Sequence, residues 1–432
     1  MKICGWGRYP VIDSNQQLIK SHSQSSECVK RPFRGIARGL GRSYGDSGLA
    51  KQTLNTAYLN HFIDFQAQTG RLRCASGVTL AELIELFLPQ GWFLAVTPGT
   101  KFITVGGAVA SDVHGKNHHV LGCFSECVES INILLANGET VECSRNQHAQ
   151  LFHATCGGMG LTGVILAVSL RLQKVTSAFM KVRTVKTSSL EETFACFEEN
   201  SSTSYSVAWI DCLAGKRQKG FGRSLISLAE HDTIGELKTP PCTPRSVPMN
   251  MPSLLLNSQS MKLFNNLYYH HARNAEKRAH IHQFFYPLDS LLNWNRLYGR
   301  QGFLQYQFLL PKNAGIEGFK AMLKPIIASG RGSFLAVLKL LGKENRNYLS
   351  FPQEGYSLAL DFKINTGIFE FLDGLDKILI DYGGRVYLAK DARMNENTFK
   401  KSYPKWESFQ TVRDQYGATE KFQSMQSKRL GL

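Results

Sequence analysis

The sequence predicts an α+β fold divided into two domains, on three observations. Its 432 residues are enough for two or three domains of about 100–200 residues each, and 43% of them are hydrophobic, which excludes disordered and fibrous classes. Up to about Val175, Gly-rich loops separate short strand-like segments. From Ser204 onward, strand-like runs alternate with helix-like stretches, a pattern that is typical of a mixed sheet covered by helices.

Turn and cap signals locate the elements of the first half. The segments FQAQTGRLRC and INILLANGETVECS are each predicted to form a hairpin around a Thr-Gly or Asn-Gly turn. Between them, Thr79 and Glu82 form a capping box that opens the apolar run LIELFL, so we expect a helix there. Further on, AQLFHAT has a helical pattern, and the alternating, β-branched GVILAVSLRL predicts a strand.

Four runs predict strands in the second half: SYSVAWIDC, FLQYQFLLP, SFLAVLKLL and YSLALDF. Helices are expected near 314–328 and 367–382. Five of the 14 prolines fall in Pro240–Pro252, inside a long, basic and poorly periodic stretch from Arg217 to Arg278. We expect this stretch, about 217–278, to be a mobile excursion near a site.

The net charge and the cysteine content indicate which partners and which cellular compartment the sequence favours. The formal net charge of +16 favours an anionic partner, which could be nucleic acid, a lipid head-group surface or a phosphorylated ligand. The ten cysteines contain no C-x-x-C pair, which favours free thiols in a reducing compartment. We expect no signal peptide and no membrane span, and therefore a cytoplasmic protein, soluble or peripheral at the inner face of a membrane.

A literal G-x-G-x-x-G occurs at Gly158, Gly160 and Gly163, but a dinucleotide fingerprint needs a strand before the glycines and a helix after them. Here the helical pattern precedes and the strand pattern follows, which argues against a Rossmann site. The loop Ala37–Asp46 has the spacing G-x-G-x-x-x-G, and its backbone N–H groups could form an anion nest for a pyrophosphate. The alternative is an ordinary tight surface turn.

The run Pro98–Gly115 has small residues at nearly every position from Gly106 to Ser111, which admits either a flat ligand or tight helix packing. It ends in HGKNHH, which holds three histidines. With Lys116 among them and no acidic or cysteine partner at ligand spacing, we expect no metal site. Substrate hydrogen bonding, acid–base work and a purely structural role remain open for each histidine.

Taken together and in order, these loops resemble the FAD-binding domain of the vanillyl-alcohol oxidase / p-cresol methylhydroxylase (PCMH) superfamily. More narrowly, the chain resembles the decaprenylphosphoryl-β-D-ribose 2′-oxidase family. The narrower resemblance rests on ARGLGRSYGD, PGTKFITVGGAVASDVHGKNHH, LFHATCGGMGLTG, FYPLD, NWNRLYG, GFLQYQF and GGRVYLAKD, which together span Gly5 to about Pro404. HGKNHH and GFLQYQF are the most specific of these blocks.

The resemblance implies a PCMH-type FAD-binding domain of two subdomains over 1–175, completed by 385–432. It also implies an α+β substrate-binding domain with an antiparallel sheet over 176–384. The implied FAD contacts are Ala37, Arg38, Gly39, Leu40, Gly41, Arg42, Ser43, Tyr44, Gly45, Asp46, Ser47, Gly99, Thr104, Val105, Gly106, Gly107, Ser111, Asp112, Val113, His114, Ile165 and Tyr387. The implied substrate contacts are Lys116, Trp209, Tyr286, Gln305, Gln307 and Lys390.

Two positions stand out against the family pattern. Many relatives attach FAD through a His where Arg42 stands, and because Arg cannot form that bond we expect non-covalent FAD. A mycobacterial Asn-x-Cys on a pocket strand reads Ser357-Leu-Ala359 here, so the pocket is expected to be reshaped there and the identity of the sugar or its lipid carrier stays open.

Oxidation of an alcohol on a flavin needs the C–H bond close to the ring, a proton acceptor and positive charge beside the reduced ring. Lys390, Lys116 and His114 are the catalytic candidates, and the choice of base between Lys390 and His114 stays open. Gln305 and Gln307 lie two apart on a predicted strand, so they share a face and could hold neighbouring hydroxyls.

The resemblance implies oxidation of a polyprenyl-phosphoryl pentose to a keto sugar, with an NAD(P)H-dependent short-chain reductase completing an epimerisation. The basic excursion would then rest on an anionic membrane surface. A soluble alditol or aldonolactone oxidase is the alternative function. A non-catalytic nucleic-acid-binding protein is a remote one, because the basic residues are spread out except near 216–223 and 271–278, and no nucleic-acid partner is expected.

Overall fold

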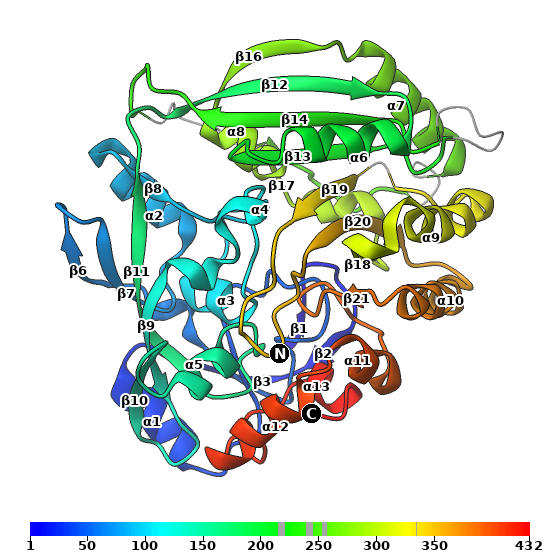
Figure 1. Cartoon of the computed structure of the whole chain (residues 1–432). Helices are drawn as coiled ribbons and strands as arrows, with labels where there is room; N and C mark the ends of the chain where they lie inside the picture. Colours follow the sequence, from blue (N-terminus) through cyan, green and yellow to red (C-terminus); the bar gives the residue numbers. More distant parts are fainter. Residues whose placement is uncertain (215–220, 239–244, 253–256, 334) are drawn as a thin grey trace.

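Two lobes make up the molecule, which we describe from a computed structural model covering residues 1–214, 221–238, 245–252, 257–333 and 335–432 (Figure 1). The blue-to-cyan N-terminal half and the red C-terminal helices lie together in the lower lobe. The green and yellow segments form the upper lobe around one large sheet. The fold class is α+β, as predicted.

The lower lobe contains two principal sheets. A parallel sheet has the order β3 (Asn15–Leu18), β5 (Gln52–Asn55), β4 (Ile36–Arg38), and α1 (His22–Lys30) connects the first strand to the last. An antiparallel sheet has the order β10 (Thr140–Ser144), β9 (Val128–Leu134), β11 (Val164–Lys174), β7 (Arg71–Ala75), β6 (Phe62–Gln66), and β8 (Trp92–Leu94) pairs with β11. The pairs β6–β7 and β9–β10 confirm both predicted hairpins.

Helix α2 (Leu80–Phe87) begins at the predicted capping box. Thr79 Oγ1 accepts from the Glu82 N–H at 3.1 Å, and the Glu82 carboxylate accepts from the Thr79 N–H at 2.7 Å. This exchange satisfies two backbone donors that the first helical turn leaves without partners. The buried face of the helix then packs Leu80, Leu83, Ile84 and Phe87 into the core.

The glycines 158–163 connect α5 (Ala149–Thr155) to β11, so the order is helix, glycine loop, strand, as the sequence indicated. A Cβ at Gly163 would lie 2.5 Å from the Leu134 carbonyl oxygen, and Gly163 has a φ of +159°. The glycines therefore permit a tight connection into the sheet, and the order of elements is not that of a Rossmann fingerprint, although Met159 of this loop lines the cavity described below.

The upper lobe is an eight-stranded antiparallel sheet. Its order is β16 (Ala275–His280), β12 (Phe179–Thr187), β14 (Ser224–His231), β13 (Tyr205–Ile210), β19 (Ala336–Leu341), β20 (Gly355–Lys363), β18 (Phe303–Pro311), β21 (Arg385–Val386). Helices α6 (Leu190–Glu199), α9 (Gly315–Ser329) and α10 (Ile368–Asp381) contact its strands from one side. The four predicted strands and two predicted helices of this half are confirmed.

The expected excursion over 217–278 is not irregular where the structure describes it. It contributes strand β14, between β12 and β13, helix α7 (Ser258–His271) and the start of the edge strand β16. Sequence periodicity missed β14 because the strand is buried along most of its length between β12 and β13 and so lacks a regular alternation of exposed and buried residues. The parts of the excursion at 217–220, 239–244 and 253–256, which hold three of its five clustered prolines, lie outside the described residues.

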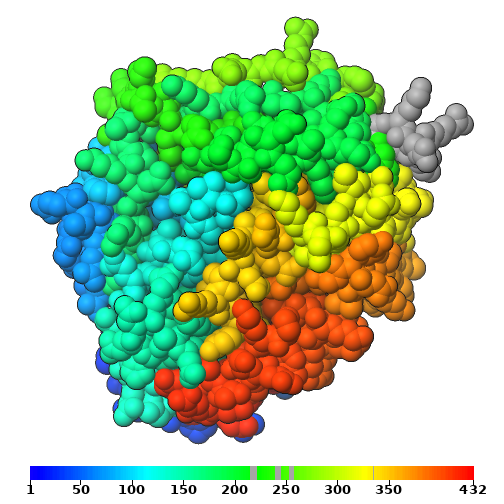
Figure 2. Space-filling view, viewed as in Figure 1, coloured from blue at the N-terminus to red at the C-terminus, as the bar shows by residue number. Residues whose placement is uncertain are grey.

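The C-terminal segment returns to the lower lobe through α11 (Glu396–Ser402), α12 (Trp406–Gln415) and α13 (Met425–Arg429). The Gly35 N–H donates to the Lys421 carbonyl at 3.0 Å, and the Gln423 N–H donates back to the Gly35 carbonyl at 2.8 Å. These contacts support, as a proposal, a first domain of 1–175 and 385–432 interrupted by 176–384. Figure 2 shows the red C-terminal segment packed against the rest of the lower lobe. In the described ranges, no helix combines the length and the apolar character that a membrane crossing needs.

Candidate active site

A cavity of about 1070 Å³ lies where the two lobes meet. The lower lobe contributes the loop 37–48 and the run 97–116, and the upper lobe contributes the sheet face opposite its helices. Alternate residues of that sheet point into the cavity, among them Val207, Trp209, Leu225, Ser227, Gln305, Gln307, Val337, Lys339, Ser357 and Ala359. The cavity therefore combines a glycine-rich end with a polar sheet wall.

The loop 37–48 is closed by Arg38 rather than left as a free surface turn. Its guanidinium donates to the carbonyls of Gly48 at 3.0 Å and Cys4 at 2.7 Å. A Cβ at Gly45 would lie 1.8 Å from the Asp391 carbonyl oxygen, so no larger residue fits at this position. The glycine backbone is thus held in place while it lines the cavity, which is the arrangement that a phosphate-bearing ligand requires.

The residues present at this end fit FAD. Gly99 leaves open space where its Cβ would stand, on the cavity side of the loop. The Nδ1 atom of His114, which lines the cavity, is buried and has no partner in the protein. The predicted FAD contacts that line the cavity are Ala37, Arg38, Gly39, Leu40, Gly41, Arg42, Ser43, Tyr44, Gly45, Ser47, Gly99, Thr104, Gly107, Ser111, Val113, His114 and Tyr387.

Five predicted FAD contacts do not line the cavity. Asp46 points away and pairs with Arg429 of α13 at 2.7 Å. Asp112 accepts hydrogen bonds from neighbouring segments, including the loop that joins β19 to β20. Val105 and Ile165 are buried core residues, and a Cβ at Gly106 would lie 2.8 Å from the Ser76 Cβ. Of the two alternatives for the run 106–111, a flat ligand or tight helix packing, tight packing therefore accounts for Gly106.

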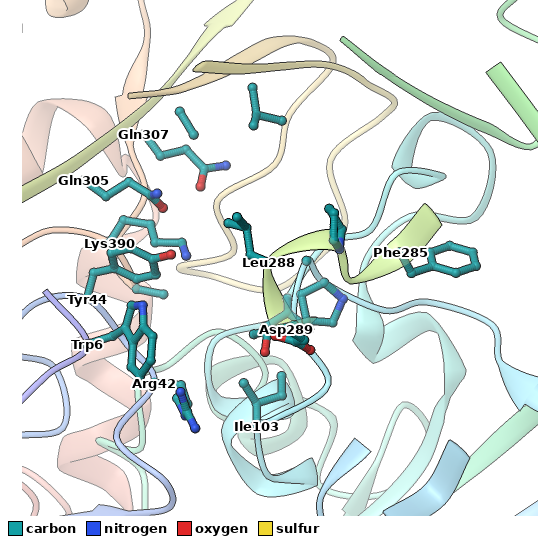
Figure 3. A pocket seen from close by; sticks show the side chains of 18 of the residues that line it. Trp6, Arg42, Tyr44, Ile103, Phe285, Leu288, Asp289, Gln305, Gln307 and Lys390 are labelled. Carbon is teal, nitrogen blue, oxygen red and sulfur yellow. The ribbon is translucent and has the colours of Figure 1, made fainter. Parts of the chain in front are cut away.

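Three lysines face the cavity from different elements. Burial lowers the pKa of Lys116 to about 7, of Lys390 to about 7 and of Lys339 to about 8. The charge of Lys339 lowers the first two further, whereas Asp361 opposes the shift at Lys390. Lys390 Nζ lies 3.7 Å from the Tyr44 ring centroid, and Figure 3 shows Gln305, Lys390 and Tyr44 side by side.

Lys339 and Asp361 were not among the predicted site residues. Lys339 pairs with Ser357 across the sheet, and Asp361 accepts from Gln305 Nε2 at 2.6 Å and from the Tyr298 hydroxyl at 3.1 Å. Burial raises the pKa of Asp361 to about 6, although the hydrogen bonds and Lys390 favour its charged form. Lys339 lies in the run SFLAVLKLL and Asp361 in the run YSLALDF. A charged residue in an otherwise apolar strand is costly to bury, and this is the sequence signal that could have identified both residues.

His114 is neutral and oriented by Gln307. The Gln307 amide nitrogen lies 3.0 Å from His114 Nε2 and 3.1 Å from Ser357 Oγ. Because an amide nitrogen can only donate, Nε2 accepts and Nδ1 carries the ring proton. Burial, followed by the charge of Lys339, holds the pKa of His114 well below its usual range. The side chain is therefore a hydrogen-bond donor, with its acceptor nitrogen already used.

The three histidines of HGKNHH make separate hydrogen bonds, although the His114 and His118 rings meet edge to face with 6.3 Å between their centroids. His118 Nδ1 accepts from the Gly342 N–H at 3.0 Å, and His119 Nε2 lies 2.8 Å from the Thr203 carbonyl. Lys116 lies between His114 and His118 in sequence, and its ammonium donates to the Phe284 carbonyl and lies 4.2 Å from the Phe284 ring centroid. Among the described residues, no group of three or more His, Cys, Asp or Glu side chains could hold a metal ion.

Most predicted substrate contacts line the cavity: Lys116, Trp209, Gln305, Gln307, Ser357, Ala359 and Lys390. Tyr286 does not, because it is buried and its hydroxyl bonds to Thr97 Oγ1 at 2.7 Å. Its neighbours Leu288 and Asp289 face the cavity instead, on the wall opposite Lys390 (Figure 3).

Sequence comparisons agree with this geometry. Residues 24–144 match the FAD binding domain family, and residues 357–430 match the D-arabinono-1,4-lactone oxidase family. The decaprenylphosphoryl-beta-D-ribose oxidase of Mycolicibacterium smegmatis is 35% identical over 453 aligned residues, covering 100% of this chain and 97% of the relative. An uncharacterized protein of Streptomyces coelicolor is 31% identical over 82% of this chain and 100% of its own length. L-gulonolactone oxidase of Bos taurus is 29% identical over 26% of each chain.

Proposed function

Because this chain belongs to the decaprenylphosphoryl-β-D-ribose oxidase family of FAD-binding oxidoreductases, we propose that its cavity oxidises a secondary hydroxyl of a polyprenyl-phosphoryl pentose. The product is a keto sugar, formed as the first half of an epimerisation. The observation that carries the proposal is the continuity of one cavity from the glycine loop to a wall of three lysines and two glutamines. A flavin and a small anionic sugar can therefore meet inside it.

FAD supplies the acceptor for the hydride that leaves the alcohol carbon. The loop 37–48 would hold its pyrophosphate, and Tyr387 and His114 line the adjoining part of the cavity. Arg42 stands where many relatives carry the His that attaches FAD, and its guanidinium lies 4.3 Å from the Trp6 ring centroid. We therefore expect FAD to be held without a covalent bond, so that acid precipitation releases it.

Lys390 is the base that the geometry favours. With its pKa lowered to about 7, a large fraction of its amine is neutral near neutral pH and can take the hydroxyl proton. Asp361, oriented by Gln305 and Tyr298, lies close enough to influence Lys390 by charge and so to stabilise the ammonium that forms. His114 is the less favoured base because its Nε2 already accepts from Gln307, and its proposed role is to position the substrate by donating from Nδ1.

Lys116 and Lys339 provide the charge that a phosphoryl sugar needs. In a pentose phosphorylated at its anomeric carbon, the phosphoryl group is on the carbon next to C2, so cations must lie beside the reacting position. A buried lysine without a counter-ion is costly, and both pKa values are lowered for that reason. An anionic substrate restores the charge balance, whereas a neutral alditol or lactone does not.

One observation favours a second candidate function. Residues 357–430 match the D-arabinono-1,4-lactone oxidase family, and this segment carries Ser357, Ala359 and Lys390 of the cavity wall. A soluble alditol or aldonolactone oxidase is therefore the alternative. The lysine-rich cavity argues against it, because neutral sugars leave Lys116 and Lys339 without a counter-charge. The nucleic-acid-binding alternative is set aside, because the chain belongs to an oxidoreductase family.

Two partners belong to the proposal. A keto sugar must be reduced to complete an epimerisation, so we expect an NAD(P)H-dependent short-chain reductase to take the product. A substrate with a polyprenyl chain stays in a bilayer, so we expect the protein to work at the anionic inner face of a membrane. Quinone and oxygen both remain candidates for the electron acceptor.

The test is spectroscopic. The purified protein should be yellow, and acid precipitation should move the flavin into the supernatant. A panel of substrates is then added without oxygen while flavin absorbance is followed. Bleaching by a lipid-linked phosphoryl pentose supports the proposal. Bleaching by a free alditol or aldonolactone alone supports the alternative.

A further inference from the structure

Helix α7 (Ser258–His271) has four exposed apolar or aromatic side chains, whereas its two buried side chains are Asn265 and Tyr269. Leu263 is 62% exposed and Leu267 is 53% exposed, and Phe264 and Tyr268 are exposed beside them. On a helix, residues four apart lie on one face, so these two pairs form one apolar stripe. We call the side chains of Leu263, Phe264, Leu267 and Tyr268 the α7 stripe.

The opposite face of α7 is fixed by polar contacts. Asn265 is fully buried, and its Nδ2 donates to Asp211 at 2.8 Å. Tyr269 is buried as well, with its hydroxyl donating to the Thr187 carbonyl at 3.0 Å and Arg223 4.5 Å from its ring centroid. The helix is therefore anchored with the α7 stripe outward, and rotation about its axis would break these buried hydrogen bonds.

Charge around the α7 stripe is positive. The helix contains no Asp or Glu, and it holds Lys262 near its start and two histidines in its last turn. The strand that follows adds exposed Lys277, with Arg273 just before it, whereas Arg278 is ion-paired with Asp232 at 2.7 Å. Glu276 is the one acidic residue from 257 to 280. An apolar stripe beside cations is the arrangement that binds an anionic lipid surface.

The α7 stripe also reaches the cavity. Tyr268 belongs to both, because it is 47% exposed, lines the cavity and lies 5.0 Å from the Trp209 ring, centroid to centroid. His271, Ala272, Arg273, Ala275 and Lys277 continue the cavity lining after it. Figure 1 places α7 at the outer end of the upper lobe, beside β16. A lipid held at the α7 stripe is thus adjacent to the cavity.

We propose that the α7 stripe inserts into an anionic bilayer surface and hands a lipid-linked substrate to the cavity while its hydrocarbon chain stays in the lipid. The hand-over rests on the proposed function, whereas vesicle binding can be measured without it. The stripe is the apolar contact, and Arg273 and Lys277 supply the attraction to the head groups.

The experiment uses the FAD-loaded full chain and flotation with vesicles of phosphatidylglycerol and phosphatidylcholine. The variant L263Q/L267Q removes two apolar side chains of the stripe, and I63Q/L86Q is the matched control, since Ile63 and Leu86 are 43% and 45% exposed on the lower lobe. We expect L263Q/L267Q to lose about tenfold or more in vesicle binding. The control should bind as the unmodified chain does, and high salt should weaken binding.

Substrate delivery provides the second readout. A vesicle-embedded, long-chain phosphoryl pentose should bleach the flavin of L263Q/L267Q about tenfold more slowly, while a water-soluble short-chain analogue should bleach both proteins equally. If neither compound bleaches the unmodified chain, the proposed function fails and vesicle binding still decides this inference.

Three results overturn the inference. The first is equal vesicle binding by L263Q/L267Q and the unmodified chain. The second is equal binding to vesicles of phosphatidylcholine alone, which removes the anionic surface. The third is a dimer of the unmodified chain that becomes monomeric in L263Q/L267Q without any vesicle binding, which would make the α7 stripe a contact between two copies.

Discussion

At the residue scale, the least predictable feature of the site is the protonation of its lysines. The family resemblance identified Lys116 and Lys390, but it did not show that Lys339, from a strand more than two hundred residues after Lys116, would lie near both. It also could not choose between Lys390 and His114, because that choice depends on which His114 nitrogen Gln307 occupies. Both answers depend on tertiary contacts that no local pattern encodes.

Replacing Lys390 should remove the group that takes the hydroxyl proton from the substrate. We expect K390M to reduce its flavin about 100-fold or more slowly than the unmodified chain, which is the usual size of a general-base contribution. The measurement is single-turnover bleaching without oxygen. H114F is the comparison, and it should weaken substrate binding more than it slows the bleaching at saturating substrate. Equal bleaching rates for K390M and the unmodified chain would exclude Lys390 as the base.

The pH dependence of bleaching follows from the pKa of Lys390. A neutral amine accepts the proton, so the rate should rise with pH and level off above about 7, the pKa to which burial lowers this group. In K390M this rise should disappear, which assigns it to Lys390. His114 should not contribute to the profile near neutral pH, because its pKa lies well below the usual range for histidine. A rate that falls with pH through this interval would contradict the assignment.

Lys339 should set the preference for an anionic substrate. Replacing it in K339M removes one cation beside the phosphoryl group, and we expect kcat/KM for the phosphoryl pentose to fall about 10- to 100-fold. Bleaching by a neutral aldonolactone should be unchanged or faster, because an uncompensated charge has been removed. The ratio of the two kcat/KM values is the measurement. A parallel loss for both compounds would indicate a structural role.

At the element scale, the sequence predicted individual hairpins, caps and strands because their signals are local, as in the Thr79 capping box. It missed β14, whose burial comes from β12 and β13 on either side. It also assigned Asp46 to the cofactor, because a loop motif does not show that this carboxylate turns toward α13. Pattern alone could place neither a strand that is buried along most of its length nor a carboxylate whose partner comes from the C-terminal helix.

The contact between α13 and the loop 37–48 should be essential for holding FAD. Arg429 pairs with Asp46 at 2.7 Å and with Asp391 at 2.9 Å, and both carboxylates are buried. R429M removes the cation that pairs with Asp46 and one of the two cations that act on Asp391, so we expect a loss of about 3–5 kcal/mol of unfolding free energy and a weaker hold on FAD. Denaturant unfolding and flavin content after dialysis measure the two effects.

Arg34 provides the control for this variant. It pairs with Glu420 at 3.1 Å, but both side chains are more than 70% exposed, so R34M should change stability by less than about 1 kcal/mol. Equal effects of R34M and R429M would mean that the buried contact between α13 and the loop does not hold the site together.

At the scale of the whole molecule, two lobes and a returning C-terminus enclose one cavity. The composition shift near Val175 predicted two domains, but the return of residues 385–432 to the first came only from the family resemblance. The structure places part of the +16 net charge at two specific sites: the three lysines inside the cavity and the cations beside α7. These two sites favour a phosphoryl sugar on a lipid as the anionic partner. Composition alone could not distinguish that partner from nucleic acid.

The central claim is that one cavity joins FAD to a phosphoryl pentose. Its most direct test is the oxygen-free, single-turnover bleaching of the FAD-loaded chain, with a polyprenyl-phosphoryl pentose compared with the same pentose without its phosphoryl lipid. We predict stoichiometric bleaching by the phosphoryl compound and bleaching by the free sugar that is at least about 100-fold slower, because the buried lysines then lack their counter-charge. Equal bleaching by both compounds, or bleaching by the free sugar alone, would contradict the account.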